Sequence, residues 1–239
     1  MPVSRIAKTS SVLGILSLLL LPVSALGTQF GVFHFRIGLL LFLAAAIIGL
    51  VVIVIAALRT RRQPDEASQK QLSRSALLAL PAIAAFGFTA LSGGGAPLIH
   101  NVTTNPDNPP AFVAAASRRG GESNPLTYTE ETAALQKAGY PDLKTLHTPL
   151  SSDQAFARAL SVCNLLGWEV YHEDKNAGQI EAVASTRWFN FKDDIAIRLQ
   201  AGDSGTAIDL RSVSRVGKGD LGANARRIQK FIALFAESD

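Results

Sequence analysis

Three long apolar stretches occupy the first part of the chain. They cover about residues 12–30, 37–58 and 76–91, and the second stretch contains no charged residue. At ~1.5 Å of rise per residue the second makes about 33 Å of helix, enough to cross a bilayer. The first also fits the apolar part of a signal peptide, but the short gap before the second favours a helical hairpin. Residues 1–91 are therefore predicted to be a membrane anchor with three transmembrane helices, of which the third, with Pro81 and Gly87, is the shortest.

The regular pattern stops after the third stretch. Residues 92–149 begin near Gly93-Gly94-Gly95 and continue through a run from Asn105 to Pro110 that is rich in proline and asparagine. This composition argues against regular structure. Thr129, followed by two glutamates, is typical of the start of a short helix. This part is predicted to be a tether and extended segment with one short helix.

Residues 150–239 show regular periodicity again. Ser151 and Gln154 have the spacing of a capping box, and the apolar residues that follow lie on one helical face. Alternation then predicts four strands, near 168–173, 180–186, 194–200 and 207–215, and spacings of three and four predict a last helix from about Asp220. Because the connections are short, the prediction is an α+β domain: a helix, a four-strand antiparallel meander and a second helix, in two layers.

Charge is distributed unevenly along the chain. The formal net charge is +4 at pH 7, yet eight basic and only two acidic residues precede Ser92. Positive charge beside apolar stretches indicates membrane topology rather than nucleic-acid binding. The loop between the second and third stretches holds most of it: Arg59, Arg61, Arg62, Lys70 and Arg74. If this loop is cytoplasmic, the C-terminal domain of a protein in the bacterial cytoplasmic (inner) membrane faces the periplasm; if the third stretch does not span, the domain is cytoplasmic.

The amino-acid composition does not support a cysteine site, a zinc site or a transport path. Cys163, the only cysteine, falls in an apolar helical pattern and is predicted to be buried packing. The four histidines show no spacing typical of a zinc site. The apolar stretches contain no acid, which favours an anchor over a transporter. No cofactor or metal is predicted, and the oligomeric state is open.

One run of residues near the C-terminus carries a family resemblance. It extends from Arg211-Ser212-Val213-Ser214-Arg215 through a glycine turn to Asn224, and Trp188 to Asp194 supports it. With these motifs the chain resembles the bacterial domain-of-unknown-function family 1499, from about Pro97 to the C-terminus. The resemblance implies an N-terminal membrane segment, which agrees with the apolar stretches. It implies no activity and no catalytic residue.

The same run supplies the candidate binding residues. Arg211 and Arg215 share strand parity, so both side chains leave the sheet on one face, as does Asp209. One interpretation is a network of paired charges on an open sheet face. Another is an anion site formed by arginines and the start of the last helix, with Arg215 facing the ligand and Arg211 structural. The candidate residues are Asp193, Asp194, Arg198, Arg211, Ser212, Ser214, Arg215, Asp220, Asn224 and Trp188.

Two other features of this region have structural and functional interpretations. Gly217, Gly219 and Gly222 match a dinucleotide fingerprint, but too little chain follows for the required second strand, so a structural turn capped by Asp220 is preferred. Trp188 and its neighbouring phenylalanines fill a core or, in a loop, serve binding.

The sequence thus leaves two functions open. The first is a membrane-anchored, extracytoplasmic binding or interaction module that recognises an anionic envelope component or a protein partner. The alternative is an enzyme that acts on an envelope substrate through Asp193 or Asp194 with Arg211 and Arg215. No nucleophile elbow accompanies the serines, and catalysis is the less favoured interpretation.

Overall fold

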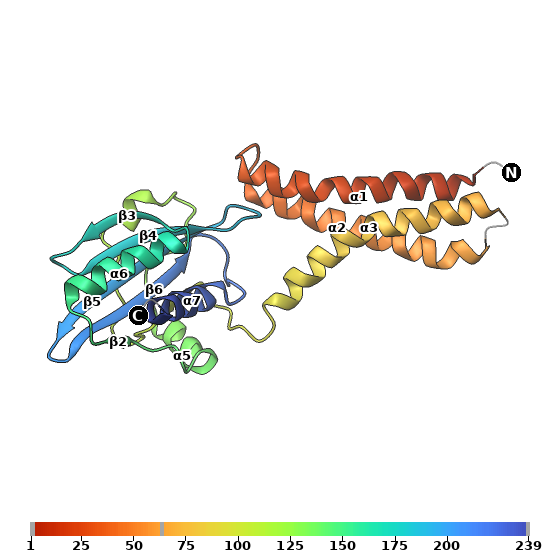
Figure 1. The fold of residues 1–239 in the computed structure, drawn as a ribbon. Helices are drawn as coiled ribbons and strands as arrows, with labels where there is room; N and C mark the ends of the chain where they lie inside the picture. The colour runs from red at the N-terminus through yellow and green to blue at the C-terminus, as the bar shows by residue number, and fades with distance from the viewer. Residues whose placement is uncertain (1–2, 63–64, 238–239) are drawn as a thin grey trace. The chain divides into compact units, whose positions relative to one another are not determined.

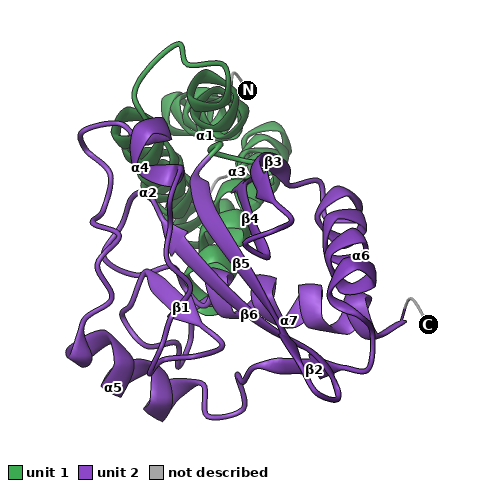
Figure 2. Cartoon of the chain, turned by 90° about the vertical axis from the view of Figure 1, so that its left-hand side faces the viewer, with its two compact units in different colours: residues 1–92, 187–190 green, residues 93–186, 191–239 purple. Residues whose placement is uncertain are grey.

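The computed structural model describes residues 3–62 and 65–237, which form two compact units (Figures 1 and 2). The first unit comprises residues 1–92 together with 187–190, and the second comprises 93–186 and 191–239. The sequence places domain boundaries at 91 and 149. In the structure, residues 93–149 group with the C-terminal domain.

Three helices make up most of the first unit: α1 (Arg5–Gln29), α2 (Phe35–Arg59) and α3 (Glu66–Ser92), with a short 3-10 turn, η1, at Thr60–Arg62. All three are long and apolar enough to cross a membrane. α3 is longer than the predicted third stretch, because its first turns are polar and carry Glu66, Lys70 and Arg74. The prediction of three apolar helices is confirmed.

Small residues allow these helices to approach closely. Gly14 on α1 leaves room for the backbone of Ser75 on α3, since an added Cβ would lie 2.8 Å from the Ser75 carbonyl oxygen. Ser17 donates a hydrogen bond of 2.9 Å to the carbonyl oxygen of Ala45 on α2. Such small-residue contacts are typical of helices that pack within a membrane, where apolar side chains gain little by leaving lipid.

The second unit is built on one six-stranded sheet. The strands β3 (Glu169–Asp174), β4 (Gln179–Ser185), β5 (Lys192–Gly202) and β6 (Gly205–Ser214) form an antiparallel meander. Two three-residue strands, β1 (Asn101–Thr103) and β2 (Leu146–Thr148), both pair antiparallel with β6. The α+β meander predicted from the alternation is confirmed. β1 and β2 are additions from the segment that the sequence assigns to a tether.

Two helices cover one face of this sheet. α6 (Ser152–Leu165) begins at the predicted capping box of Ser151 and Gln154, and α7 (Ala223–Glu237) ends the described chain. Their apolar sides pack on alternate strand residues, and Trp168 stacks on Phe231 at 5.7 Å between ring centroids. Cys163 lies buried in this core, as predicted, and burial raises its pKa to about 12. The helices α4 (Ala115–Arg118) and α5 (Glu130–Gly139) belong to the segment that precedes β2.

Candidate functional site

The sheet face opposite α6 and α7 is polar and is not open to solvent. Paired strand residues share a face, so one row across the sheet runs Thr103, Arg211, Ala196, Glu181. Neighbouring rows add Asp194 and, further along, the pair Arg198 and Asp209. Residues 105–128 lie over this face and bind it through their backbone. The expectation of an open face fails because this segment supplies an irregular third layer.

Asp194 is the centre of the buried charge network. Its carboxylate is fully buried and accepts hydrogen bonds from Arg119 and from two nitrogens of Arg215, at 3.0 and 2.7 Å. Arg118 contributes its carbonyl oxygen to Arg215, at 3.0 Å, and its guanidinium lies over the ring of Tyr171. Hydrogen bonding to Asp194 raises the pKa of Arg215, although burial opposes it. Arg215 is therefore held by the protein's own carboxylate.

Arg211 is buried without an acidic partner among the described residues. Its guanidinium lies between the rings of Phe112 and Tyr128, at 5.2 and 5.7 Å from their centroids. Its donors reach three oxygens: the side chain of Asn101 at 3.0 Å, the Pro110 carbonyl at 3.1 Å, and the carbonyl of Leu126. Burial lowers its pKa to about 10. Arg211 therefore acts as a clamp for the covering segment, through the carbonyl oxygens of Pro110 and Leu126.

Glu181 holds the same segment at another point. Its carboxylate is fully buried and accepts from the backbone N–H groups of Val113, Ala114 and Ala115, at the start of α4. A carboxylate at a helix start satisfies amides that have no partner within the helix. Glu181 and Arg211 thus both hold the backbone of residues 105–128. Glu181 accepts hydrogen bonds from its N–H groups, and Arg211 donates hydrogen bonds to its carbonyl oxygens.

The helix face of the sheet carries a second polar cluster. Ser212 donates to Asn224 Oδ1 at 2.6 Å, and the Asn224 amide donates to Ser214 Oγ at 2.9 Å and to the carbonyl of His100 at 3.1 Å. Arg227 bridges Asn224 and Asp193. This cluster attaches the start of α7 to β6 and to the residue before β1.

The glycine turn that leads into α7 is a structural device. Gly217 and Gly222 have φ values of 92° and 79°, in the left-handed region that favours glycine. Asp220 accepts from the backbone N–H groups of Gly222 and Asn224, at 2.8 and 2.7 Å. Its carboxylate thereby caps the helix start, as the sequence predicts.

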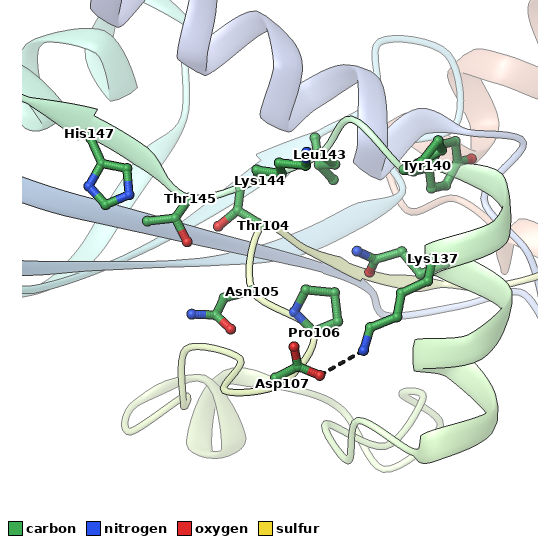
Figure 3. A pocket seen from close by; sticks show the side chains of 12 residues that line it. Thr104, Asn105, Pro106, Asp107, Lys137, Tyr140, Leu143, Lys144, Thr145 and His147 are labelled. Atoms are coloured by element: carbon green, nitrogen blue, oxygen red, sulfur yellow. Dashed lines mark hydrogen bonds and ion pairs between the residues drawn. The ribbon is translucent and has the colours of Figure 1, made fainter.

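Two clefts in the second unit that are open to solvent have Lys, Arg or Asp side chains in their walls. The larger of these two, about 530 Å³, is lined by the segment after β1 and the turn from α5 to β2 (Figure 3). Lys137 pairs there with Asp107 at 2.7 Å, while Lys144 and His147 line the opposite wall. At its edge, Asp209 is buried; burial raises its pKa, but hydrogen bonds from Thr145, Arg198 and Asn105 outweigh this and hold the pKa below its ordinary value. Charges of both signs surround this cleft.

The second cleft, of about 340 Å³, is more uniform in charge. We name it the basic pocket. Its walls come from the connection between α6 and β3 (residues 166–168), the end of β4, and the first turns of α7. Arg226, Arg227 and Lys230 line it, and its ten lining residues include no Asp or Glu. Among the described residues, Arg227 pairs with Asp193, whereas no acid lies within ion-pair distance of Arg226 or Lys230.

The family model described as a protein of unknown function, DUF1499, matches residues 101–235. The chain belongs to this family. The match begins at β1, ends within α7 and leaves the three apolar helices outside the DUF1499 domain. None of the curated proteins matches the chain.

Within the DUF1499 domain, the predicted binding residues do not meet at one point. Asp193 and Asp194 point to opposite faces of β5, the first to Arg227 and the second to Arg119 and Arg215. Arg198 pairs with Asp209 at 2.7 Å. The structural contacts given above account for five other candidates: Arg211, Ser212, Ser214, Asp220 and Asn224. None of the residues Asp193, Asp194, Arg211 and Arg215 lines either cleft.

Other important residues of the domain escaped the sequence interpretation. Arg119 and Glu181 complete the buried network, and Arg226, Arg227 and Lys230 form the basic pocket. The basic pocket has one signal in the sequence. Three basic residues at the start of the last helix, at spacings of one, three and four, place positive charge on adjoining sides of that helix. Trp188, which was singled out, is 58% exposed in the loop between β4 and β5.

Proposed function

We propose that this protein is a membrane-anchored binding module whose DUF1499 domain takes up an anionic group in the basic pocket. The observation that carries the proposal is the lining of that pocket: three cations and no carboxylate. A guanidinium binds phosphate or carboxylate with paired hydrogen bonds, and a lysine adds a point charge. The pocket relies on side chains, because Asp220 already occupies amides at the start of α7.

The charge balance in the pocket favours a ligand. Arg227 is neutralised by Asp193 on its sheet side, which fixes its position beside the cavity. Arg226 and Lys230 keep their charges exposed on the same helix. Like charges three and four residues apart on a helix repel one another by a few tenths of a kcal/mol. A bound phosphate or carboxylate removes this repulsion.

We place the DUF1499 domain outside the cytoplasm, in the periplasm of a bacterium with two membranes. The support is the cluster of basic residues between α2 and α3, which the positive-inside rule assigns to the cytoplasmic side. With α3 as a third span, the chain after Ser92 emerges on the other side. The ligand would then be an anionic component of the envelope.

The pocket is tested by thermal unfolding of the full chain in a neutral detergent, with and without inorganic phosphate. Phosphate at about 100 times its dissociation constant stabilises a binding protein by ~2.7 kcal/mol. We expect a phosphate-dependent rise in the melting temperature that is lost in the double variant Arg226→Gln, Lys230→Gln.

The matched control removes the same charge from the larger cleft, with Lys137→Gln and Lys144→Gln. This variant should retain the full shift. An equal shift in the Arg226/Lys230 variant, or no shift in the unaltered protein, would contradict the proposal.

Topology is tested separately by fusing a reporter that is active only in the periplasm. A fusion after the last residue should be active, and one at Gln69, between α2 and the apolar part of α3, should be silent. The opposite pattern places the domain in the cytoplasm and contradicts the orientation while leaving the pocket untouched.

A further inference from the structure

We propose that the anion taken up by the basic pocket is the headgroup phosphate of an anionic membrane lipid, with Trp188 anchored in the bilayer interface beside it. This inference rests on the proposed anion site and names its ligand. Three independent features support this inference: the path of the chain after α3, the loop that continues from the pocket wall, and the charge of the pocket.

The chain enters the second unit next to the start of α7. Gly93 follows Ser92, the last residue of α3, and an added Cβ at Gly93 would lie 2.5 Å from Leu221. Further along, Leu98 approaches Gly219 in the same way. The linker thus lies along the turn that leads into α7, whose first residue, Ala223, lines the pocket. The chain that follows α3 therefore reaches the turn before α7 within its first residues.

The loop between β4 and β5 continues directly from the pocket wall. Ser185 and Thr186 line the pocket, and residues 187–190 follow them. The neck of the loop is closed, because Thr186 N–H donates to the Phe191 carbonyl and Phe191 N–H donates to Thr186 Oγ1, both at 2.9 Å. Trp188, two residues beyond Thr186, is 58% exposed. The amphipathic tryptophan ring is favoured at the headgroup level of a bilayer.

The two chemistries together match one kind of ligand. Free phosphate would satisfy the cations but would leave Trp188 in water. A phospholipid offers a phosphate to Arg226 and Lys230 and an interface for the neighbouring loop, where Arg187 adds a further positive charge. Basic side chains near an anionic lipid surface each contribute about fivefold to binding. Anionic phospholipid is thus the source of phosphate that this arrangement fits.

The experiment uses the full chain in nanodiscs of phosphatidylcholine alone or of equimolar phosphatidylcholine and phosphatidylglycerol. A lipid with a nitroxide near its headgroup quenches tryptophan at the interface. The chain has two tryptophans, and Trp168 is buried in the core, so the difference between the unaltered protein and Trp188→Phe reports on Trp188. We expect strong quenching of Trp188 in the phosphatidylglycerol discs, and its loss in Arg226→Gln, Lys230→Gln.

The outcomes separate this inference from the proposed function. If phosphate stabilises the protein in detergent but Trp188 is not quenched in either disc, the anion site stands and the lipid assignment is overturned. Equal quenching in both discs that survives removal of Arg226 and Lys230 also overturns it, because the tryptophan then inserts without headgroup recognition. If neither phosphate stabilisation nor quenching is seen, both proposals fail.

Discussion

Replacing Asp194 with asparagine is expected to destabilise the DUF1499 domain by roughly 3–5 kcal/mol, since this change removes one partner of a buried ion-pair cluster. The asparagine keeps the shape of the side chain. It leaves Arg119 and Arg215 buried, with side chains only 5% and 15% exposed and no carboxylate between them. In the native protein, burial lowers the pKa of Arg119, and repulsion from Arg215 lowers it further, while Asp194 opposes both effects. Without Asp194 this repulsion is no longer offset. The lost free energy of unfolding is measured by urea unfolding of the full chain in detergent. The unfolding is followed by near-ultraviolet circular dichroism, to which the buried Trp168 contributes.

The matched control is Asp153→Asn, which breaks an ion pair with Lys175 whose side chains are 75% and 56% exposed. An exposed pair contributes ~0–1 kcal/mol, so this variant should unfold near the unaltered protein. Adding Arg119→Gln to Asp194→Asn should restore part of the lost stability, because one unpaired charge is removed. If Asp194→Asn costs no more than Asp153→Asn, the buried cluster does not hold the covering segment in place.

The sheet and its helices were predictable because their signals are local. Ile195, Ile197 and Leu199 alternate along β5, and the capping box at Ser151 marks the start of α6. The two short strands were not predictable. Asn101–Thr103 and Leu146–Thr148 are too short to show alternation, and each becomes a strand only by pairing with β6. Both strands depend on a long-range pairing with β6, which the local sequence pattern does not predict.

The covering segment shows why the polar face was misjudged. Glycine and proline between residues 105 and 128 predict a tether, and nothing local indicates that its backbone meets buried side chains. Glu181 alternates with inward apolar residues of β4, so its pattern predicts a solvent-facing charge. In the structure it is fully buried because three backbone N–H groups of the segment replace water. Every residue type except proline has a backbone N–H group, so a partner of this kind cannot be recognised from the amino-acid sequence.

The long motif near the C-terminus was recognised, but its internal roles were not. The sequence treats Ser212, Ser214 and Arg215 as one candidate set. The strand sends Ser212 and Ser214 to the helix face, where they bind Asn224, and Arg215 to Asp194 on the covered face. The motif therefore joins both faces of β6 to their neighbours, and its last residue is the one that fastens α7.

Asn224→Ala is accordingly expected to cost ~2–4 kcal/mol, through several buried hydrogen bonds lost at once. The Asn224 side chain is fully buried and links four groups. Without it, Ser214 and the His100 carbonyl lose a donor, while Ser212 and Arg227 lose an acceptor. Each of these hydrogen bonds contributes about 0.5–1.5 kcal/mol, and small shifts or an entering water recover part of the sum. Hydrogen exchange should show the first turns of α7 opening more often than the rest of the sheet.

The control for this variant is Asn176→Ala, in the exposed turn between β3 and β4. A surface substitution of this kind changes stability by no more than ~0.5 kcal/mol. Because Asn224 also holds Arg227 beside the basic pocket, its loss should weaken phosphate stabilisation, whereas Asn176→Ala should leave it unchanged. An Asn224→Ala protein that unfolds and exchanges like the control would show that the motif's final asparagine does not attach the helix. The anchoring of α7 would then rest on the ion pair of Arg227 with Asp193 and on the apolar side of the helix, through Phe231 and Phe235.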